Sequence, residues 1–197
     1  MKKISGIITN KSGEVLENVF VALKDSRFED VLSTTTNENG EYLLEAEEGY
    51  YPFLIAVREY AENFLEYWCQ NIYLIGDIEI NAKIDKLEIY GLNCFVIKGA
   101  YPALTIYFRP MSLSRICKKE KDIAPILSSE MVNASVNGIP SKIYLLNKVR
   151  EFCGDCNMTA YLMQISHPSE LREKEKNLLH IHVMDESGNI GEASLYF

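Results

Sequence analysis

The stretch Ser33–Val57, which reads STTTNENGEYLLEAEEGYYPFLIAV, decides the fold class. Its threonines favour extended backbone, and they precede Asn39-Gly40, a dipeptide that tolerates the positive φ of a tight turn. The segment Glu41–Glu45 then alternates, and Glu47-Glu48-Gly49 separates it from a further extended run, Tyr50–Val57. Three strands joined by two short turns predict an antiparallel meander.

Alternating segments bounded by turn residues continue on both sides of this stretch. The predicted strands are Lys3–Thr9, Val19–Lys24, Ile78–Ile84, Leu87–Lys98, Leu104–Arg109, Met131–Val136, Lys142–Glu151, Met158–Ser166, Leu178–Met184 and Gly191–Phe197. We therefore expect an all-β protein of two packed antiparallel β-sandwich domains, residues 1–85 and 86–197. The expected boundary is Ile84-Asp85-Lys86, with a turn at Gly99–Pro102 in the second domain.

The composition excludes several classes of protein. The chain has 197 residues, 47% of them hydrophobic, and a formal net charge of -8, which opposes binding to nucleic-acid phosphates. No apolar window reaches the length of a membrane span, and no glycine-rich phosphate loop indicates a nucleotide. We find no export signal, and the number of cysteines, five, is odd; both observations predict reduced thiols and a cytoplasmic location. We expect no cofactor.

Glycines mark turns and branched residues alternate in four segments of the first 85 residues: Ser5–Thr9, Gly13–Val21, Thr36–Tyr42 and Glu48–Tyr51. In these segments the chain resembles the carboxypeptidase regulatory-like domain, a transthyretin-like β-sandwich. It implies an accessory, non-catalytic domain of a fold group that includes starch-binding relatives.

The segment 178–197 has turn residues at Asp185, Gly188 and Asn189, followed by the extended run Ser194–Phe197. With these residues in matching places, it resembles the last hairpin of bacterial immunoglobulin-like domains. Closely spaced strands with turn residues between them independently predict a second sandwich.

Aromatic residues gather in three segments that predict a ligand-binding surface: Tyr50–Phe53, Arg58–Tyr60 and Phe64–Trp68. Aromatic rings stack on the apolar faces of sugars, and charged groups bond to sugar hydroxyls. The candidate binding residues are Arg58, Tyr60, Tyr67 and Trp68. The alternative is that these rings fill a core or a domain interface, which the position of Trp68 just before the boundary favours.

Two motifs raise the alternative of a metal site. Cys153-Gly154-Asp155-Cys156 and His180-Ile181-His182 together offer two thiols and two imidazoles, a set that zinc accepts. The simpler interpretation is a pair of loop thiols and two surface histidines. Since Leu179, Ile181 and Val183 alternate with the histidines, we expect His180 and His182 to point away from the core.

No catalytic constellation is apparent, so we expect a non-catalytic binding or interaction protein. A carbohydrate-binding accessory module is its more specific form, and the expected partner is a protein or an oligosaccharide. Two alternatives remain open. One is a metal-dependent hydrolase that uses Cys153, Cys156, His180 and His182. The other is a structural module that associates with itself through exposed strand edges.

Overall fold

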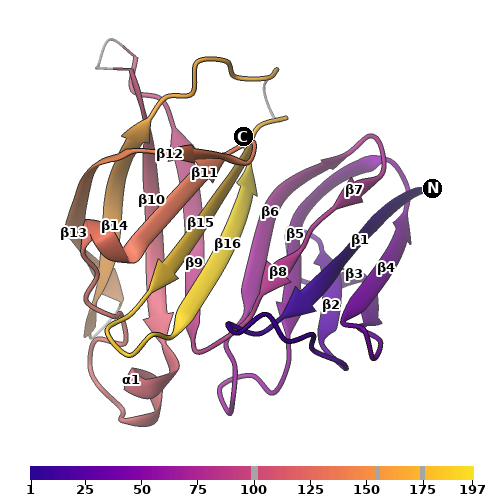
Figure 1. The fold of residues 1–197 in the computed structure, drawn as a ribbon, viewed down its shortest axis with the longest axis horizontal. Coiled ribbons are helices and arrows are strands. Elements are labelled where there is room, and N and C mark those ends of the chain that lie inside the picture. Colours follow the sequence, from indigo (N-terminus) through magenta and orange to yellow (C-terminus); the bar gives the residue numbers. More distant parts are fainter. Residues whose placement is uncertain (99–101, 154–155, 174–175) are drawn as a thin grey trace.

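A computed structural model of the chain describes residues 1–98, 102–153, 156–173 and 176–197 (Figure 1). The described chain forms strands β1–β16, one short α-helix, α1 (Leu113–Cys117), and a 3-10 turn, η1 (Ser129–Met131). The prediction of an all-β protein built from packed, mostly antiparallel sheets is confirmed. The predicted turn at 99–102 lies outside the described residues except for Pro102.

The first half contributes a small sheet in the order β4-β1-β7, with β8 also pairing with β1. Strand β1 runs antiparallel to β4 and parallel to β7 and β8. The strand bounds are β1 (Lys2–Thr9), β4 (Glu41–Ala46), β7 (Ile78–Glu79) and β8 (Ala82–Lys83).

One sheet runs through both halves of the chain, in the order β12-β11-β15-β16-β6-β5-β2-β3. The junction between the halves is a parallel pairing of β16 with β6, in which Ala193 lies opposite Trp68. The strand bounds are β2 (Phe20–Lys24), β3 (Asp30–Thr35), β5 (Gly49–Val57), β6 (Tyr67–Leu74), β11 (Val132–Val136), β12 (Ile139–Ser141), β15 (Leu178–Met184) and β16 (Ile190–Tyr196).

The second half contributes a four-stranded sheet in the order β13-β14-β10-β9. Its strands are all antiparallel to their neighbours. The bounds are β9 (Leu87–Phe95), β10 (Ala103–Ser112), β13 (Ile143–Cys153) and β14 (Cys156–Ser166).

The two smaller sheets cover opposite faces of the long sheet, so the protein has two separate cores. Strand alternation shows this at β6, where Tyr67 and Cys69 enter the core under the β1 sheet and Trp68 enters the core under the β9–β10 sheet. At β16, Ala193 and Leu195 enter the same core as Trp68. Each face of the long sheet is therefore covered by a smaller sheet over half of its strands only. Where the smaller sheet ends, the uncovered part of the face lies lower than the covering sheet, and we call this change of level a step.

The predicted meander over Ser33–Val57 is wrong in its pairing. Strands β3 and β5 both pair with β2, whereas β4 crosses to the other sheet and pairs with β1. The crossing is held at Thr36, whose buried hydroxyl donates to the Leu16 carbonyl at 2.6 Å and accepts from the Val19 amide at 2.9 Å. Asn39-Gly40 does form the predicted turn, with Gly40 at φ 72°.

A second pairing also differs from the prediction. The strand that returns after the Asn137-Gly138 turn is the short β12, and the predicted returning segment, Lys142–Glu151, lies in β13 of the other sheet. Both turn residues have positive φ, as expected for this dipeptide. Turn chemistry is local, whereas the choice of sheet depends on which core the inward side chains reach.

The division at residue 85 stays a prediction. Ile84 belongs to one core and Leu87 to the other, and Asp85, the last residue of the predicted first domain, is buried. Its carboxylate accepts from the Ile190 amide at 2.9 Å, and its carbonyl accepts from the Leu65 amide at 2.8 Å. In the described part of the chain, no helix has the length and apolarity needed to cross a membrane.

Candidate functional site

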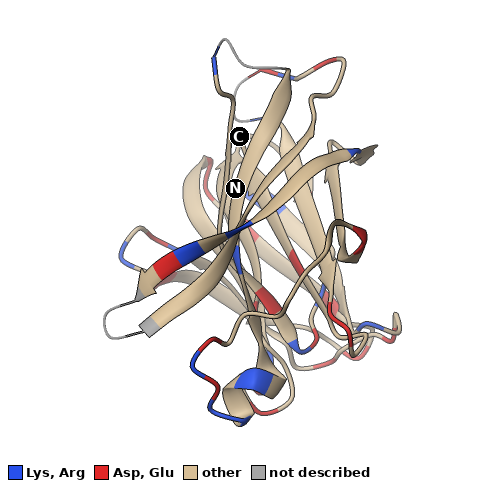
Figure 2. Ribbon diagram, turned by 90° about the vertical axis from the view of Figure 1, so that its left-hand side faces the viewer, with Lys and Arg blue, Asp and Glu red and all other residues tan. Residues whose placement is uncertain are grey.

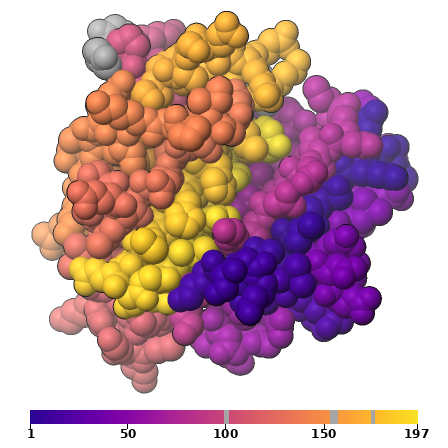
Figure 3. Space-filling view, viewed as in Figure 1, coloured from indigo at the N-terminus to yellow at the C-terminus, as the bar shows by residue number. Residues whose placement is uncertain are grey.

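A cleft lies on the outer face of β11, β15 and β16, in the step beside β7 and β8 (Figure 3). It consists of two adjoining hollows of about 460 Å³ and about 300 Å³, and both have Ser135 and His180 in their walls. The larger hollow extends over β11 and β12, and the smaller one reaches Tyr67 of β6 and Asn81 of the β7–β8 connection. Residues from both halves of the chain therefore form the cleft.

Strand alternation places the polar side chains of the cleft in two rows. Leu179, Ile181 and Val183 are fully buried, so His180 and His182 face the cleft, as the alternation predicts. In the first row, Ser135 of β11 lies opposite His180 of β15, which lies opposite Ser194 of β16. In the second row, Asn133, His182 and Glu192 lie opposite one another in the same way.

A chain of polar contacts links the two halves beneath the cleft. The Tyr67 hydroxyl donates to Ser194 Oγ at 2.9 Å, and Ser194 Oγ lies 3.1 Å from His180 Nδ1. His180 Nε2 lies 3.9 Å from Glu192 Oε1, and the other Glu192 oxygen accepts from the Lys83 amide at 3.0 Å. These contacts fix the His180 ring in the floor of the cleft.

Burial keeps both imidazoles of the cleft uncharged near neutral pH. Desolvation, followed by the charges of His182 and Lys83, lowers the pKa of His180 to about 4. Desolvation and Lys83 also lower the pKa of His182. A neutral imidazole has one donor and one acceptor nitrogen, so each ring can bond to a ligand hydroxyl in either sense.

The serine, histidine and glutamate of this network do not form a nucleophile–base pair that is ready for catalysis. Ser194 is only 4% exposed, and its oxygen already accepts a hydrogen bond from Tyr67. The separation of 3.9 Å between His180 and Glu192 exceeds a hydrogen bond. The arrangement therefore orients His180, and we assign it a structural role in shaping the cleft.

The structure leaves the metal prediction untested at its cysteines. Cys153 and Cys156 flank the β13–β14 turn, and their side chains lie outside the described residues. His180 and His182 lie on β15, in a different sheet. Among the residues that the structure describes, no group of three or more His, Cys, Asp or Glu side chains could hold a metal ion.

The four predicted aromatic-surface residues do not form one exposed face. Tyr67 and Trp68 are adjacent on β6, so they point to opposite sides of the sheet, where they are 1% and 7% exposed. Tyr60 is 48% exposed on a loop, and Arg58 donates to the Glu17 carbonyl at 3.0 Å. The alternative interpretation, that the rings fill cores, describes Tyr67 and Trp68.

Trp68 belongs to an aromatic cluster in the step on the opposite face. Phe28 stacks on it at 5.2 Å between ring centroids, and Tyr90 meets it edge-on at 5.5 Å. Its indole nitrogen donates to Glu88 at 3.0 Å. Burial, followed by the charge of Glu66, raises the pKa of Glu88 to about 7. Hydrogen bonds from the Glu66 amide, Trp68 and Tyr60 lower this pKa, but by less than burial and the Glu66 charge together raise it.

Sequence reasoning missed two surfaces. The first is the set of cleft partners of the histidines, Ser135, Ser194 and Asn133, which alternation along β11 and β16 would have indicated. The second is the pairing of Tyr50, which lies in a predicted aromatic segment, with Tyr73; the two exposed rings lie opposite each other on β5 and β6 with centroids 4.8 Å apart. Its signal was visible only with the strand register known, because the two residues come from different strands.

Comparisons with known proteins give remote likenesses only. No family model matches the chain, and no curated protein matches it. Several solved structures resemble it, among them these three. One is BcpA, the major pilin subunit of Bacillus cereus, at 12% identity over 98% of this chain and 67% of that chain, with a TM-score of 0.33. Another is a DUF3823 family protein from Bacteroides ovatus ATCC 8483, at 11% identity over 100% of this chain and 99% of that chain, with a TM-score of 0.32. A third is a "putative carbohydrate binding protein" from Bacteroides uniformis ATCC 8492, at 12% identity over 100% of this chain and 99% of that chain, with a TM-score of 0.34. Likenesses this remote carry no function to the chain.

Proposed function

We propose that the protein is a non-catalytic binding protein whose cleft takes a neutral, hydroxyl-rich ligand, with an oligosaccharide as the ligand class. The observation that carries the proposal is the lining of the cleft. Two imidazoles held neutral by burial stand in rows with serine and asparagine side chains, and together they supply donors and acceptors.

The charges of the cleft support a neutral ligand. Glu79 and Glu130 lie in its walls, and among the described residues that line the two hollows there is no Lys or Arg. Carboxylates accept hydrogen bonds from hydroxyls and repel phosphates and carboxylates. Lys83, whose charge acts on both imidazoles, is not among the lining residues, so an anionic ligand would meet the wall carboxylates with no cationic side chain in the described lining.

The finer parts of the proposal concern family and location. We retain a carboxypeptidase regulatory-like domain over 1–85, an immunoglobulin-like domain over 86–197 and a cytoplasmic location as proposals. The two domain assignments agree with the presence of two cores and with the turn residues of both halves, and the cytoplasmic location rests on the sequence alone. The binding experiment below does not depend on them.

Replacing His182 by alanine is expected to weaken oligosaccharide binding about tenfold, because the ligand loses hydrogen bonds worth roughly 1 to 1.5 kcal/mol. A glycan array selects the probe, and isothermal titration calorimetry with that oligosaccharide measures the affinity. Binding by the wild type should be constant around neutral pH and should fall as the pH approaches 4, where His180 becomes charged.

His167→Ala is the matched control, because this histidine lies outside the cleft and its ring contacts the Pro168 carbonyl. Tyr73→Ala tests the rival surface formed by the exposed aromatic pair. If Tyr73→Ala abolishes binding and His182→Ala does not, the cleft is not the site. If no oligosaccharide binds while a specific protein is recovered from a lysate, the ligand class is wrong and the partner is a protein.

A further inference from the structure

Two sheets of the protein end in strands that have one unpaired edge. Strand β13 pairs only with β14, and β4 pairs only with β1, within the residues that the structure describes. An unpaired edge presents a row of backbone donors and acceptors to any strand that can lie beside it.

The β13 edge is long, projecting and basic. The strand has 11 residues, and its pairing with β14 continues to Cys153, beyond the point where β14 leaves β10 at Tyr161. Lys148 and Arg150 are two residues apart and share one face of the strand. Figure 2 looks onto this side and shows two basic positions followed by an acidic one along the end of the strand. Phe152, next to that end, is 80% exposed.

The β4 edge is short and acidic. Tyr42, Leu44 and Ala46 face the core, so Glu41 and Glu45 project outward on either side of Leu43, which is exposed as well. The turns at its two ends add further carboxylates, those of Glu38, Glu47 and Glu48. Lys2 of β1 pairs with Glu48 at 3.2 Å and Lys3 lies opposite Glu45, so the excess of negative charge on this edge comes from Glu38, Glu41, Glu45 and Glu47.

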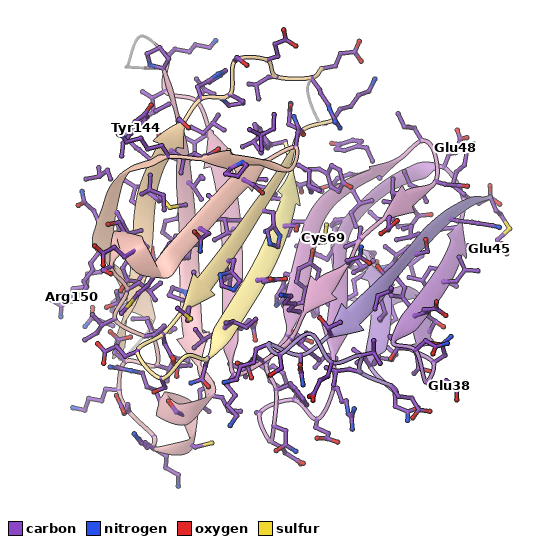
Figure 4. All side chains as sticks on the ribbon, viewed as in Figure 1. Glu38, Glu45, Glu48, Cys69, Tyr144 and Arg150 are labelled. Atoms are coloured by element: carbon purple, nitrogen blue, oxygen red, sulfur yellow. The ribbon has the colours of Figure 1, made fainter. Side chains whose placement is uncertain are left out.

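The two edges lie at opposite ends of the molecule. Figure 4 shows Arg150 at one end and Glu45 at the other. The long sheet offers poorer edges. Strand β12 has only three residues and contains Pro140, and β3 carries one charge, Asp30, which is already paired with Lys24.

We infer that copies of this chain associate head to tail, with the β13 edge of one copy lying beside the β4 edge of the next. In a register that places Arg150 of one copy opposite Leu43 of its neighbour, Lys148 lies opposite Glu41 or Glu45, according to the strand direction, and Arg150 lies diagonal to the other glutamate, at the roughly 7–8 Å that long side chains can span. Since the contact joins two different surfaces, a pair of copies keeps one free edge of each kind, β4 on one copy and β13 on the other, and the assembly grows as an open chain unless its rotation closes a ring. The inference is independent of the ligand cleft.

Reciprocal charge reversal tests this contact by sedimentation velocity over a range of concentrations. The wild type should gain weight-average mass with concentration, and lose it at salt near 1 M, where the Debye length is about 3 Å. Lys148→Glu with Arg150→Glu, and separately Glu41→Lys with Glu45→Lys, should each lower the association constant about tenfold or more, because like charges then oppose each other.

An equimolar mixture of the two variants should regain the mass of the wild type, since each reversed edge then meets an unreversed edge of opposite sign. Glu62→Lys with Glu186→Lys changes the net charge as much as the β4 variant, on exposed turns away from both edges, and should associate as the wild type does. Circular dichroism of each variant verifies that it is folded.

Three results would overturn the inference. The first is a wild type that stays monomeric at low salt and high concentration. The second is a reversed variant that associates unchanged. The third is a mass that stops at the dimer and persists when only β4 is reversed, which would indicate symmetric pairing of two β13 edges.

Discussion

A Gly6→Ala variant should lose a large part of its stability, about 3 kcal/mol or more of unfolding free energy out of the roughly 5 to 15 typical of a domain. Gly6 lies in β1 where the chain between β7 and β8 crosses it. A methyl group there would overlap the Ile80 carbonyl oxygen and lie 2.7 Å from the carbonyl carbon. These are backbone atoms, and the Ile80 amide also donates to the Ser5 carbonyl at 2.8 Å, so no side-chain adjustment relieves the overlap.

Urea denaturation measures this loss, with Gly49→Ala as the matched control. Gly49 is also a strand glycine, but nothing lies within 4 Å of the methyl group that alanine would add. The control should unfold at the wild-type midpoint or slightly above it, because alanine restricts the unfolded chain. Equal midpoints for the two variants would show that the crossing at Ile80 yields easily and that the packing argument is wrong.

A Glu88→Gln variant should be more stable than the wild type at alkaline pH, by at most about 3 kcal/mol. Burial, followed by the Glu66 charge, raises the pKa of Glu88 from 4.5 to about 7. The folded protein therefore holds this proton at pH values where the unfolded chain has released it. Below pH 4.5 both states are protonated, and stability is lost as the pH rises towards 7. Glutamine stays neutral and can still accept from the Trp68 indole through its carbonyl oxygen.

Chemical denaturation of both proteins at a series of pH values measures the effect as a difference. The stability difference between Glu88→Gln and the wild type should be smallest below pH 4.5, grow up to about pH 7 and then stay constant. Glu62→Gln, on an exposed turn, should differ from the wild type by a small amount with no such growth. Parallel curves for Glu88→Gln and the wild type would mean that Glu88 ionises in the folded protein as it does in water.

Local chemistry predicted the strands and turns well. Asn137-Gly138 turns with positive φ at both residues, and Asp185 accepts from the Ser187 and Asn189 amides, as turn residues do. Sheet membership could not be predicted in this way. Strand β4 follows β3 after a tight turn and still pairs with β1, because its alternate side chains complete a core between two sheets.

The candidate site shows the same limit. Alternation correctly aimed His180 and His182 outward, but the Tyr67–Ser194 hydrogen bond, part of the network that fixes His180, spans 127 positions of sequence. The predicted aromatic surface placed Tyr67 and Trp68 together although adjacent strand residues point to opposite faces. That error could have been avoided from the sequence, whereas the long-range partners of His180 could not have been found.

The parallel junction of β6 with β16 has a consequence for the order of events during synthesis. Asn71 and Tyr196, which are bonded across this junction, are separated by 125 positions. As a ribosome extends the chain, the edge of β6 that pairs with β16 stays unpaired until β16 has been synthesised. During that interval the nascent first half is open to pairing with other chains, and the time for which it stays open depends on the rate of translation.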